Sequence, residues 1–294
     1  TRLIKENEMS FETLQKWLKE INQDITDYDF IQFEYPHSIP IIPKIKKYGI
    51  PTGFTFMECQ TKSFAIYLYN MIKDNPVTEF DKYIKIFWNY LTAEKKAVDS
   101  ADFLITVTNG DAKAVQELGS VKTHIVPTSI SNYAVIEEIE RHKDINYEEN
   151  SVAFLGYYGH YPNIDGMRWY LNEIHPIVKE KIPDYKIYVI GRGDTSSLEK
   201  LSAGDPNVIY TGRVDSIIPP ILRAKVCILP LINGAGIRGK INQYSIAGRP
   251  SVTTWIGNHG LKYVDEESTL LADDPMKFSP TIRFTKRSRQ TPKK

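Results

Sequence analysis

A glycine-rich turn between an apolar run and a helix-like stretch holds the residue types best suited to chemistry. The turn and the start of the next segment read Gly234, Ala235, Gly236, Ile237, Arg238, Gly239 and Lys240. Glycine lets a backbone approach a ligand closely, and the N–H groups that begin a helix favour an anion such as phosphate. Arg238 and Lys240 oppose the helix dipole unless a negative ligand faces them. A simple turn with solvated basic residues explains the spacing equally well, and the string lacks the Walker pattern.

A second glycine-containing loop follows an apolar run that begins at Val152. Its residues are Gly156, Tyr157, Tyr158, Gly159 and His160. His160 could contact a phosphate or a sugar there, although a lone loop histidine is more often an ordinary polar surface residue. A third turn, Gly191-Arg192-Gly193, carries a Gly-x-Gly pattern that is weak evidence by itself.

The elements that must position these loops alternate along the second half of the chain. Apolar runs predict strands at residues 152–156, 185–191, 208–212, 226–231 and 251–255. Helical segments are expected between them, at residues 165–180, 196–201, 217–223 and 237–247. Strands that alternate with helices predict a parallel sheet covered on both faces. Ligands bind such sheets at the carboxyl ends of the strands.

The first half predicts a second, less regular α/β domain. Strands are expected at residues 28–33, 52–57, 103–107 and 124–127, and helices at 11–21 and 80–100. Residues 39–47 are expected to form a helix or a turn, and residues 108–111 a turn and cap before a helix that runs through Leu118. The polar stretch 131–150 marks a boundary between a domain at 1–135 and one at 151–280. His37 and Glu58 each follow a predicted strand and would face the cleft between the domains, where either could orient an acceptor or move a proton. Polar loop residues without a role explain both equally well.

Composition narrows the class of protein. The 294 residues carry 37 basic and 36 acidic side chains, which gives no whole-chain reason to expect nucleic acid as a partner. The segment 281–294 holds six basic residues and no acidic one, so we expect a solvated, disordered tail on a mildly acidic body. Cys59 and Cys227 lie far apart and no zinc-ligand spacing occurs, which favours a reducing cytoplasm. No apolar run is long enough to span a bilayer.

Short motifs in a fixed order give residues 152–275 a resemblance to a known family. The series is Phe154-Leu155-Gly156 with Pro162-Asn163, the Trp169 helix ending near His175-Pro176, Tyr188 to Gly191, Val208 to Val214, Ile228 to Leu231, Gly234 to Lys240, Ala247 to Val252, Asn258 to Leu261 and Leu271 to Pro275. Each piece is weak, but the ordered series resembles the carboxyl-terminal domain of the group 1 (family 4) glycosyltransferases. The segments Ala101 to Thr108 and Ile125 to Ile130 are similar, more loosely, to the end of that family's acceptor domain.

The resemblance implies a GT-B fold, that is, two Rossmann-like open parallel-sheet domains, the first incomplete in this chain. It implies a retaining hexosyltransferase that uses a nucleotide-diphosphate sugar, with neither cofactor nor metal, in cell-surface polysaccharide assembly. By the same analogy Arg238 and Lys240 neutralise the diphosphate, and Gly234 to Ile237 lie against the donor sugar. Gly156 to His160 would close over the phosphates, and Arg213 and Val214 would border the base. The acceptor would be a saccharide or lipid-linked, at the inner face of the membrane with weak peripheral association.

Two departures from the family pattern leave an alternative open. Many members carry a glutamate on each side of the turn and its helix, where this chain has Ala235 and Gln243. A glutamine still binds hydroxyl groups, but only as a neutral partner. The family's opening strand and its closing helices are also missing, so the chain reads as a shortened relative. A degenerate nucleotide- or sugar-binding protein is therefore the second hypothesis, and a GT-B-like epimerase the third.

Overall fold

The computed structural model describes residues 10–74, 80–127, 133–234 and 236–281. Tertiary contacts divide the chain into two compact units. The first comprises residues 1–129 with the short stretch 234–237, and the second comprises residues 130–233 and 238–294. The predicted basic tail lies outside the described residues, apart from its first position.

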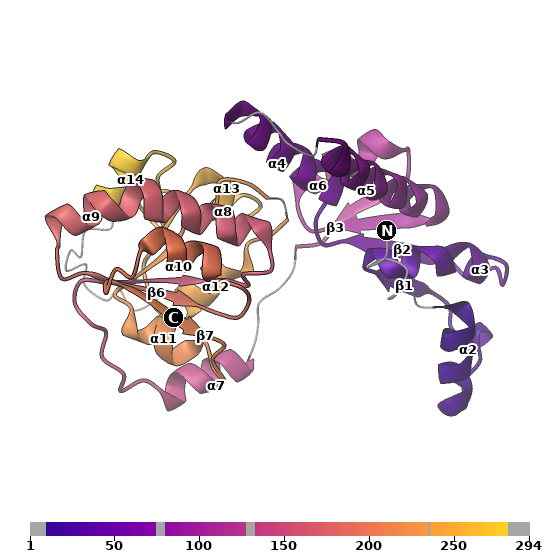
Figure 1. The fold of residues 1–294 in the computed structure, drawn as a ribbon. Helices are drawn as coiled ribbons and strands as arrows, with labels where there is room; N and C mark the ends of the chain where they lie inside the picture. Colours follow the sequence, from indigo (N-terminus) through magenta and orange to yellow (C-terminus); the bar gives the residue numbers. More distant parts are fainter. Residues whose placement is uncertain (1–9, 75–79, 128–132, 235, 282–294) are drawn as a thin grey trace. The chain divides into compact units, whose positions relative to one another are not determined.

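The first unit is built on a parallel sheet of four strands in the order β1-β2-β3-β4 (Figure 1). The strands are β1 (Ile31–Glu34), β2 (Thr52–Phe56), β3 (Phe103–Thr106) and β4 (Thr123–Ile125). All four were predicted, with ends that differ by at most three residues. Every residue of β2 is buried, as expected for a central strand with helices on both faces.

Helices link and cover these strands. They are α2 (Phe11–Glu20), η1 (Ile25–Asp27), η2 (Pro36–Ile41), α3 (Ile42–Lys46), α4 (Gln60–Asp74), α5 (Phe80–Ser100) and α6 (Asn109–Leu118). The predicted bounds of α5 and the predicted end of α6 are confirmed, whereas α6 begins at Asn109, inside the stretch expected to be a turn. Helix α4 was not predicted, because its aromatic residues do not keep to one face. Phe64 is buried, whereas Tyr69 is 70% exposed.

The second unit contains a parallel sheet of six strands in the order β10-β9-β8-β5-β6-β7. The strands are β5 (Ser151–Leu155), β6 (Lys186–Ile190), β7 (Val208–Gly212), β8 (Val226–Leu229), β9 (Ser251–Thr253) and β10 (Leu270–Leu271). The first five were predicted, and the two-residue β10 was not. Because β5 lies between β8 and β6, the chain order reverses there, and such a reversal is where open α/β sheets bind ligands.

Helices pack on both faces of this sheet (Figure 1). They are α7 (Tyr133–Arg141), α8 (Tyr161–Trp169), the π-turn η3 (Tyr170–Ile174), α9 (His175–Lys181), α10 (Ser196–Ser202), α11 (Ile218–Arg223), α12 (Gly239–Ile246), α13 (Trp255–Asn258) and α14 (Pro275–Thr281). Helix α7 lies in the stretch expected to be irregular. Helix α12 begins two residues later than predicted, because Gly236 has φ 75° and Arg238 has the non-helical angles φ −91°, ψ 80°.

Strand β5 contributes to a separate apolar core on each face of the sheet. Val152 and Phe154 pack in one cluster with residues of α8, η3 and α9. Ala153 and Leu155 pack in the other with residues of α11 and α12. This alternation follows from the two-residue repeat of a strand. Burial on both sides fixes the register of β5, and with it the point at which the loop at Gly156 begins.

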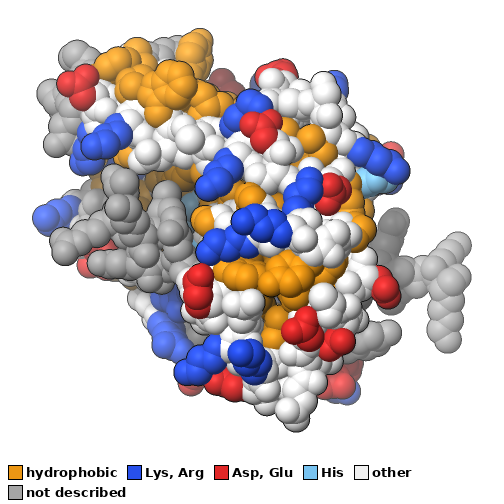
Figure 2. Space-filling model, turned by 90° about the vertical axis from the view of Figure 1, so that its right-hand side faces the viewer, with side chains coloured by type: hydrophobic (Ala, Val, Ile, Leu, Met, Phe, Trp, Pro, Cys, Tyr) orange, Lys and Arg blue, Asp and Glu red, His pale blue; other side chains and the backbone are white. Residues whose placement is uncertain are grey.

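The charges on the surface are mixed, and the two cysteines do not form a disulfide with each other. On the face that Figure 2 shows, Lys and Arg side chains are interspersed with Asp and Glu. Cys59 and Cys227 are both buried and unpaired with each other. Within the part of the chain that the structure describes, no helix is long and apolar enough to cross a membrane. In that same part, no group of three or more His, Cys, Asp or Glu side chains could hold a metal ion.

Candidate anion site of the second unit

The loops that follow β5, β6 and β7 lie side by side at the carboxyl edge of the sheet. The backbone N–H of Gly156 donates to Ile190 O at 2.8 Å, and that of Gly191 donates to Gly212 O at 3.2 Å. Tyr158 N–H donates to Arg192 O at 2.8 Å. A Cβ atom on Gly191, which has φ 128°, would lie 1.8 Å from Gly156 O. Only glycine allows these two loops to approach so closely.

Two helices begin beside these loops. Helix α8 starts after His160 and helix α12 starts after Arg238, and neither N-cap side chain makes a capping hydrogen bond. Lys240 Nζ, in the first turn of α12, donates to Oδ1 of Asn163, in the first turn of α8. A single hydrogen bond between side chains therefore joins the two helix starts. Both present N–H groups that have no partner inside the helix, together with the positive end of a helix dipole.

Three basic side chains meet at this point. Burial, with the positive charge of Arg238, lowers the pKa of Lys240 to about 7. Burial also lowers the pKa of His160 to about 4, and the charges of Lys240 and Arg238 act in the same direction. Arg238 is itself only 9% exposed. Lys240 and His160 are thus less easily charged than in water, and an anion placed beside them would relieve that cost. The structure brings together His160, Arg238 and Lys240, three of the residues predicted from the sequence to bind the donor.

The glycine-rich turn between β8 and α12 is anchored by Asn233, the residue that precedes Gly234. Gly234 and Gly236 have φ angles of 112° and 75°, which side chains rarely allow. Ala235 lies outside the described residues. Asn233 is 2% exposed and donates through Nδ2 to Asp165 Oδ2 at 2.9 Å. Asn233 and Asp165 were not predicted from the sequence, because their contact spans 68 positions.

The remaining predicted donor residues lie at the edges of this site. Gln243 is half-buried on α12, three positions after Lys240 and so on the same side of the helix. Arg213 is exposed directly after β7, and the side chain of Val214 packs against an apolar cluster. Tyr157 is 52% exposed, and its ring lies 5.3 Å from the guanidinium carbon of Arg192. Tyr158 is buried and belongs to the core.

The first unit has a cavity of about 210 Å³ at the carboxyl ends of β1 and β2. Tyr35, Phe56, Glu58 and Glu94 are among its lining residues. Tyr35 has φ 66°, a conformation that costs a tyrosine energy, and its ring stacks on His37 with centroids 5.8 Å apart. Of the two predicted acceptor-side residues, Glu58 forms part of the wall of this cavity. His37 lies beside it, through its contact with the ring of Tyr35.

Glu94 is a charged residue of this cavity that the sequence analysis missed. Its carboxylate accepts the backbone N–H groups of Gln60 at 2.6 Å and Thr61 at 3.1 Å, and the thiol of Cys59 at 3.4 Å. It therefore caps α4 from α5. Burial raises the pKa of Glu94 despite these donors. The sequence signal that could have identified Glu94 is its position one turn before Ala97 and Val98, on the face of α5 that is buried.

Comparison with known families bears on the second unit. Residues 149–284 match the family model described as glycosyl transferases group 1. An uncharacterised 44.6 kDa protein in the cps region of Klebsiella pneumoniae is 30% identical over 139 residues, which are 45% of this chain and 36% of that protein. The chain thus matches about a third of the length of this relative. The resemblance identified in the sequence is confirmed over the second unit.

Solved structures share the fold at low sequence identity. A structure of Anabaena Alr3699/HepE in complex with UDP and glucose has a TM-score of 0.62 at 10% identity, covering 92% of this chain and 72% of that chain. The UDP-forming α,α-trehalose-phosphate synthase of Burkholderia vietnamiensis has a TM-score of 0.64 at 12% identity, covering 95% and 66%. The pneumococcal O-GlcNAc transferase GtfA, in complex with UDP and GlcNAc, has a TM-score of 0.61 at 12% identity, covering 91% and 52%. The chain has the GT-B fold of these glycosyltransferases.

Proposed function

We propose that the chain is a retaining glycosyltransferase that transfers a sugar from a nucleotide-diphosphate sugar to a saccharide or glycolipid. The observation that carries the proposal is the group of basic side chains, His160, Arg238 and Lys240, between the starts of α8 and α12. A diphosphate has the charge and size to accept hydrogen bonds from both helix starts. The family match supports transferase chemistry, and the cps region of the Klebsiella relative supports a role in polysaccharide assembly.

The chemistry requires stabilisation of a leaving group. The bond between the anomeric carbon and the phosphate oxygen breaks, a bond from that carbon to the acceptor oxygen forms, and negative charge develops on the departing nucleoside diphosphate. Lys240 and Arg238 would meet that charge more strongly in the transition state than in the ground state, which is the condition for catalysis. Arg238, the charged form of Lys240 and two helix starts would supply this stabilisation without a metal ion.

The acceptor would bind at the cavity of the first unit. Aromatic rings such as Tyr35 and Phe56 offer flat apolar surface for the C–H face of a sugar ring. Glu58 would orient the accepting hydroxyl or take its proton, and His37 would support the ring of Tyr35. A saccharide of a lipid-linked acceptor fits this chemistry, and weak peripheral binding to the membrane would bring the chain to it.

Nucleotide binding tests the donor half of the proposal. Calorimetric titration with UDP and GDP should detect binding to one of them, and Lys240→Ala should weaken it by about 1.5–3 kcal/mol, the range for a charged hydrogen bond. Lys200→Ala is the matched control, because Lys200 is exposed on α10. Absence of binding to either nucleotide, or equal affinities of the two variants, would remove the anion site from the proposal.

Turnover tests the reaction itself. Incubation with labelled UDP- and GDP-sugars, with and without EDTA, should release nucleoside diphosphate at equal rates in both. The product formed on a saccharide acceptor should keep the anomeric configuration of the donor by NMR. Inversion, or dependence on an added divalent ion, would contradict the mechanism.

Gln243 favours a second candidate, a binding protein without turnover. A glutamine on the same side of α12 as Lys240 binds ribose hydroxyl groups more weakly than a glutamate does. Gln243→Glu should strengthen nucleotide-sugar binding in either case. If nucleotide binds but no acceptor or water receives the sugar, in the wild type and in Gln243→Glu alike, the second candidate holds.

A further inference from the structure

Asn163 connects the two helix starts of the anion site. It is 3% exposed, in the first turn of α8. Its Nδ2 donates to the carbonyl oxygen of Tyr157 at 2.8 Å, and its Oδ1 accepts Lys240 Nζ. Its backbone N–H donates to His160 O at 3.1 Å. One amide side chain thus contacts the loop after β5 and the first turn of α12.

We propose that Asn163 is a positioning residue that holds the ammonium of Lys240 in place for phosphate while leaving its positive charge uncompensated. The proposal rests on the proposed function, because it assigns how the same site is prepared for its anion. Lysine carries a flexible side chain with considerable rotamer entropy. Its ammonium contributes fully to binding only if that freedom is removed beforehand.

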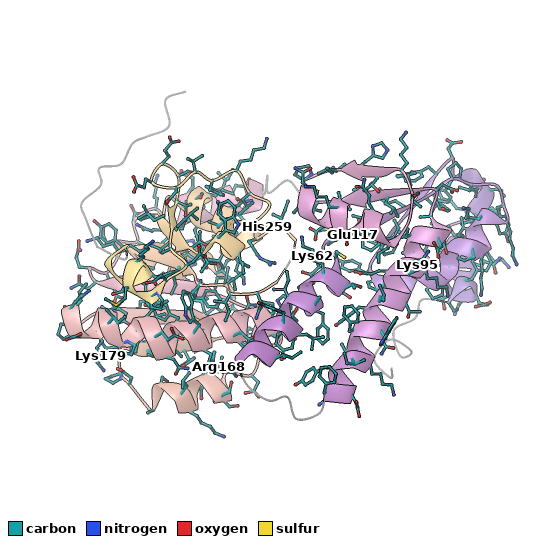
Figure 3. The ribbon with its side chains drawn as sticks, turned by 90° about the horizontal axis from the view of Figure 1, so that it is seen from above. Lys62, Lys95, Glu117, Arg168, Lys179 and His259 are labelled. Atoms are coloured by element: carbon teal, nitrogen blue, oxygen red, sulfur yellow. The ribbon has the colours of Figure 1, made fainter. Side chains whose placement is uncertain are left out.

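Neighbouring residues of α8 hold the other end of the glycine-rich turn. Asp165 accepts the Nδ2 of Asn233, the residue before Gly234, and Arg168 pairs with Asp165 at 3.1 Å. Figure 3 shows Arg168 on the helical run that continues to Lys179. A Cβ atom on Gly166 would lie 2.6 Å from Pro230 O, at the end of β8. Helix α8 therefore fixes the segment before the turn through Asp165 and Gly166, and the segment after it through Asn163.

The neutral amide is what the site requires at position 163. An amide oxygen accepts a hydrogen bond from the ammonium without forming an ion pair. An aspartate there would neutralise Lys240 and raise its pKa. The other groups facing Lys240 are Arg238 before α12, His160 in the loop after β5, and the ring of Phe154, whose centroid lies 5.2 Å from Nζ. The amide of Asn163 accepts a hydrogen bond from the ammonium and so orients it without changing the net charge.

The experiment compares Asn163→Asp with Asn172→Asp. Asn172 is exposed in η3 on the same helical run, so the control adds the same charge at the surface. Acetic anhydride labelling of each lysine, followed across pH 5.5–10 by peptide mass spectrometry, measures the pKa of Lys240 without nucleotide. In the wild type and in Asn172→Asp, Lys240 should be half-labelled near pH 7, in line with its lowered pKa. In Asn163→Asp the midpoint should rise by at least ~1 pH unit, while that of Lys200 in the same digest stays constant.

Nucleotide affinity gives the second readout. Asn163→Asp should bind UDP or GDP at least ~10-fold more weakly than Asn172→Asp, because an internal carboxylate competes with phosphate for Lys240. Asn163→Ala should also lose affinity, with no rise in the labelling midpoint. Circular dichroism establishes that each variant is folded.

Separate outcomes overturn separate claims. An unchanged Lys240 midpoint in Asn163→Asp refutes the positioning role. A raised midpoint with the nucleotide affinity of Asn172→Asp refutes the link to phosphate. If the wild type binds neither nucleotide, the proposed function fails, and the labelling series still decides whether Asn163 governs Lys240.

Discussion

The hydroxyl of Tyr244, on α12, accepts the backbone N–H of Leu155, the last residue of β5, at 2.9 Å. Tyr244 is completely buried, so this bond joins the helix that carries Lys240 to the strand that leads into Gly156. Burial keeps the pKa of Tyr244 well above its ordinary value, and the hydroxyl remains neutral. The two sides of the anion site are therefore tied together beneath it by a single side chain.

Replacing Tyr244 by Phe should remove this tie and leave the N–H of Leu155 without its partner. A buried, unsatisfied backbone donor costs about 1–3 kcal/mol of unfolding free energy. Urea denaturation measures the loss, and Tyr147→Phe is the control, because Tyr147 is 43% exposed and should change stability by less than about 0.5 kcal/mol. Equal stabilities of the two variants would show that the Tyr244–Leu155 bond carries no net free energy.

Gly191→Ala should disrupt the contact between the loops after β5 and β6. The added Cβ would lie 1.8 Å from Gly156 O, a backbone atom that cannot move alone, and φ there is 128°. Gly204→Ala separates the two effects, since Gly204 has φ 73° with nothing within 4 Å of the added atom. We expect about 1–2 kcal/mol for Gly204→Ala, from the backbone conformation only. We expect a clearly larger loss for Gly191→Ala, or failure to fold, by urea denaturation. Similar losses would mean that backbone conformation accounts for both.

Glu94 should make the first unit less stable as pH rises. Its pKa in the folded protein is raised by burial, so the folded state holds its proton to higher pH than the unfolded state does. The stabilising contribution is fully present below the unfolded pKa of about 4.3 and is lost as pH rises through the folded value. Glu94→Gln keeps an acceptor for Gln60 and Thr61 and removes this titration.

The measurement for Glu94 is the difference in unfolding free energy between wild type and Glu94→Gln across pH 4–8. That difference should shift against the wild type as pH rises. Glu117→Gln provides the control, because Glu117 is exposed on α6, where Figure 3 labels it, and its difference should stay nearly constant. A difference for Glu94→Gln that moves in favour of the wild type as pH rises would mean that the hydrogen bonds to the carboxylate outweigh its burial.

Local sequence pattern predicted the elements whose burial is regular. Helix α5 has a continuous apolar face, and strand β5 is apolar at four of its five positions, so each was located to within a residue or two. Helix α4 was missed because Tyr69 and Ile72 are exposed hydrophobic residues that blur its apolar face. The start of α12 was misplaced because the backbone angles of Gly236 and Arg238, rather than hydrophobic periodicity, delay the helix.

The residues of the candidate site also divide into those that short sequence motifs predict and those whose contacts depend on the fold. The glycines, Arg238, Lys240 and His160 stand in short motifs, and sequence alone therefore identified them. Asn163 also stands in the motif series, but its contact with Lys240 spans 77 positions, and the contact of Glu94 with Gln60 spans 34. Such contacts depend on which strands are neighbours, and periodicity along one segment holds no information about that. The pKa of Lys240 depends likewise on burial by elements distant in sequence.

Binding of a nucleoside diphosphate should draw protons from solution. With a pKa of about 7, Lys240 is about half protonated at pH 7 in the free protein. A bound anion favours the charged form, so binding at pH 7 should take up about half a proton. Uptake should be larger at pH 8 and smaller at pH 6, and affinity should fall as pH rises above 7. His160, with a pKa of about 4, is neutral across this range before the anion binds.

Calorimetry in buffers of different ionisation enthalpy measures this uptake directly. The nucleotide's own phosphate also titrates near pH 6, but its contribution is common to every variant and cancels in comparisons at one pH. Lys240→Ala should lose most of the uptake and flatten the fall in affinity between pH 7 and 8, whereas Lys200→Ala should match the wild type. If wild type and Lys240→Ala take up equal numbers of protons, Lys240 is not the group whose charge the anion restores, and the lowered pKa would belong to a lysine outside the binding site.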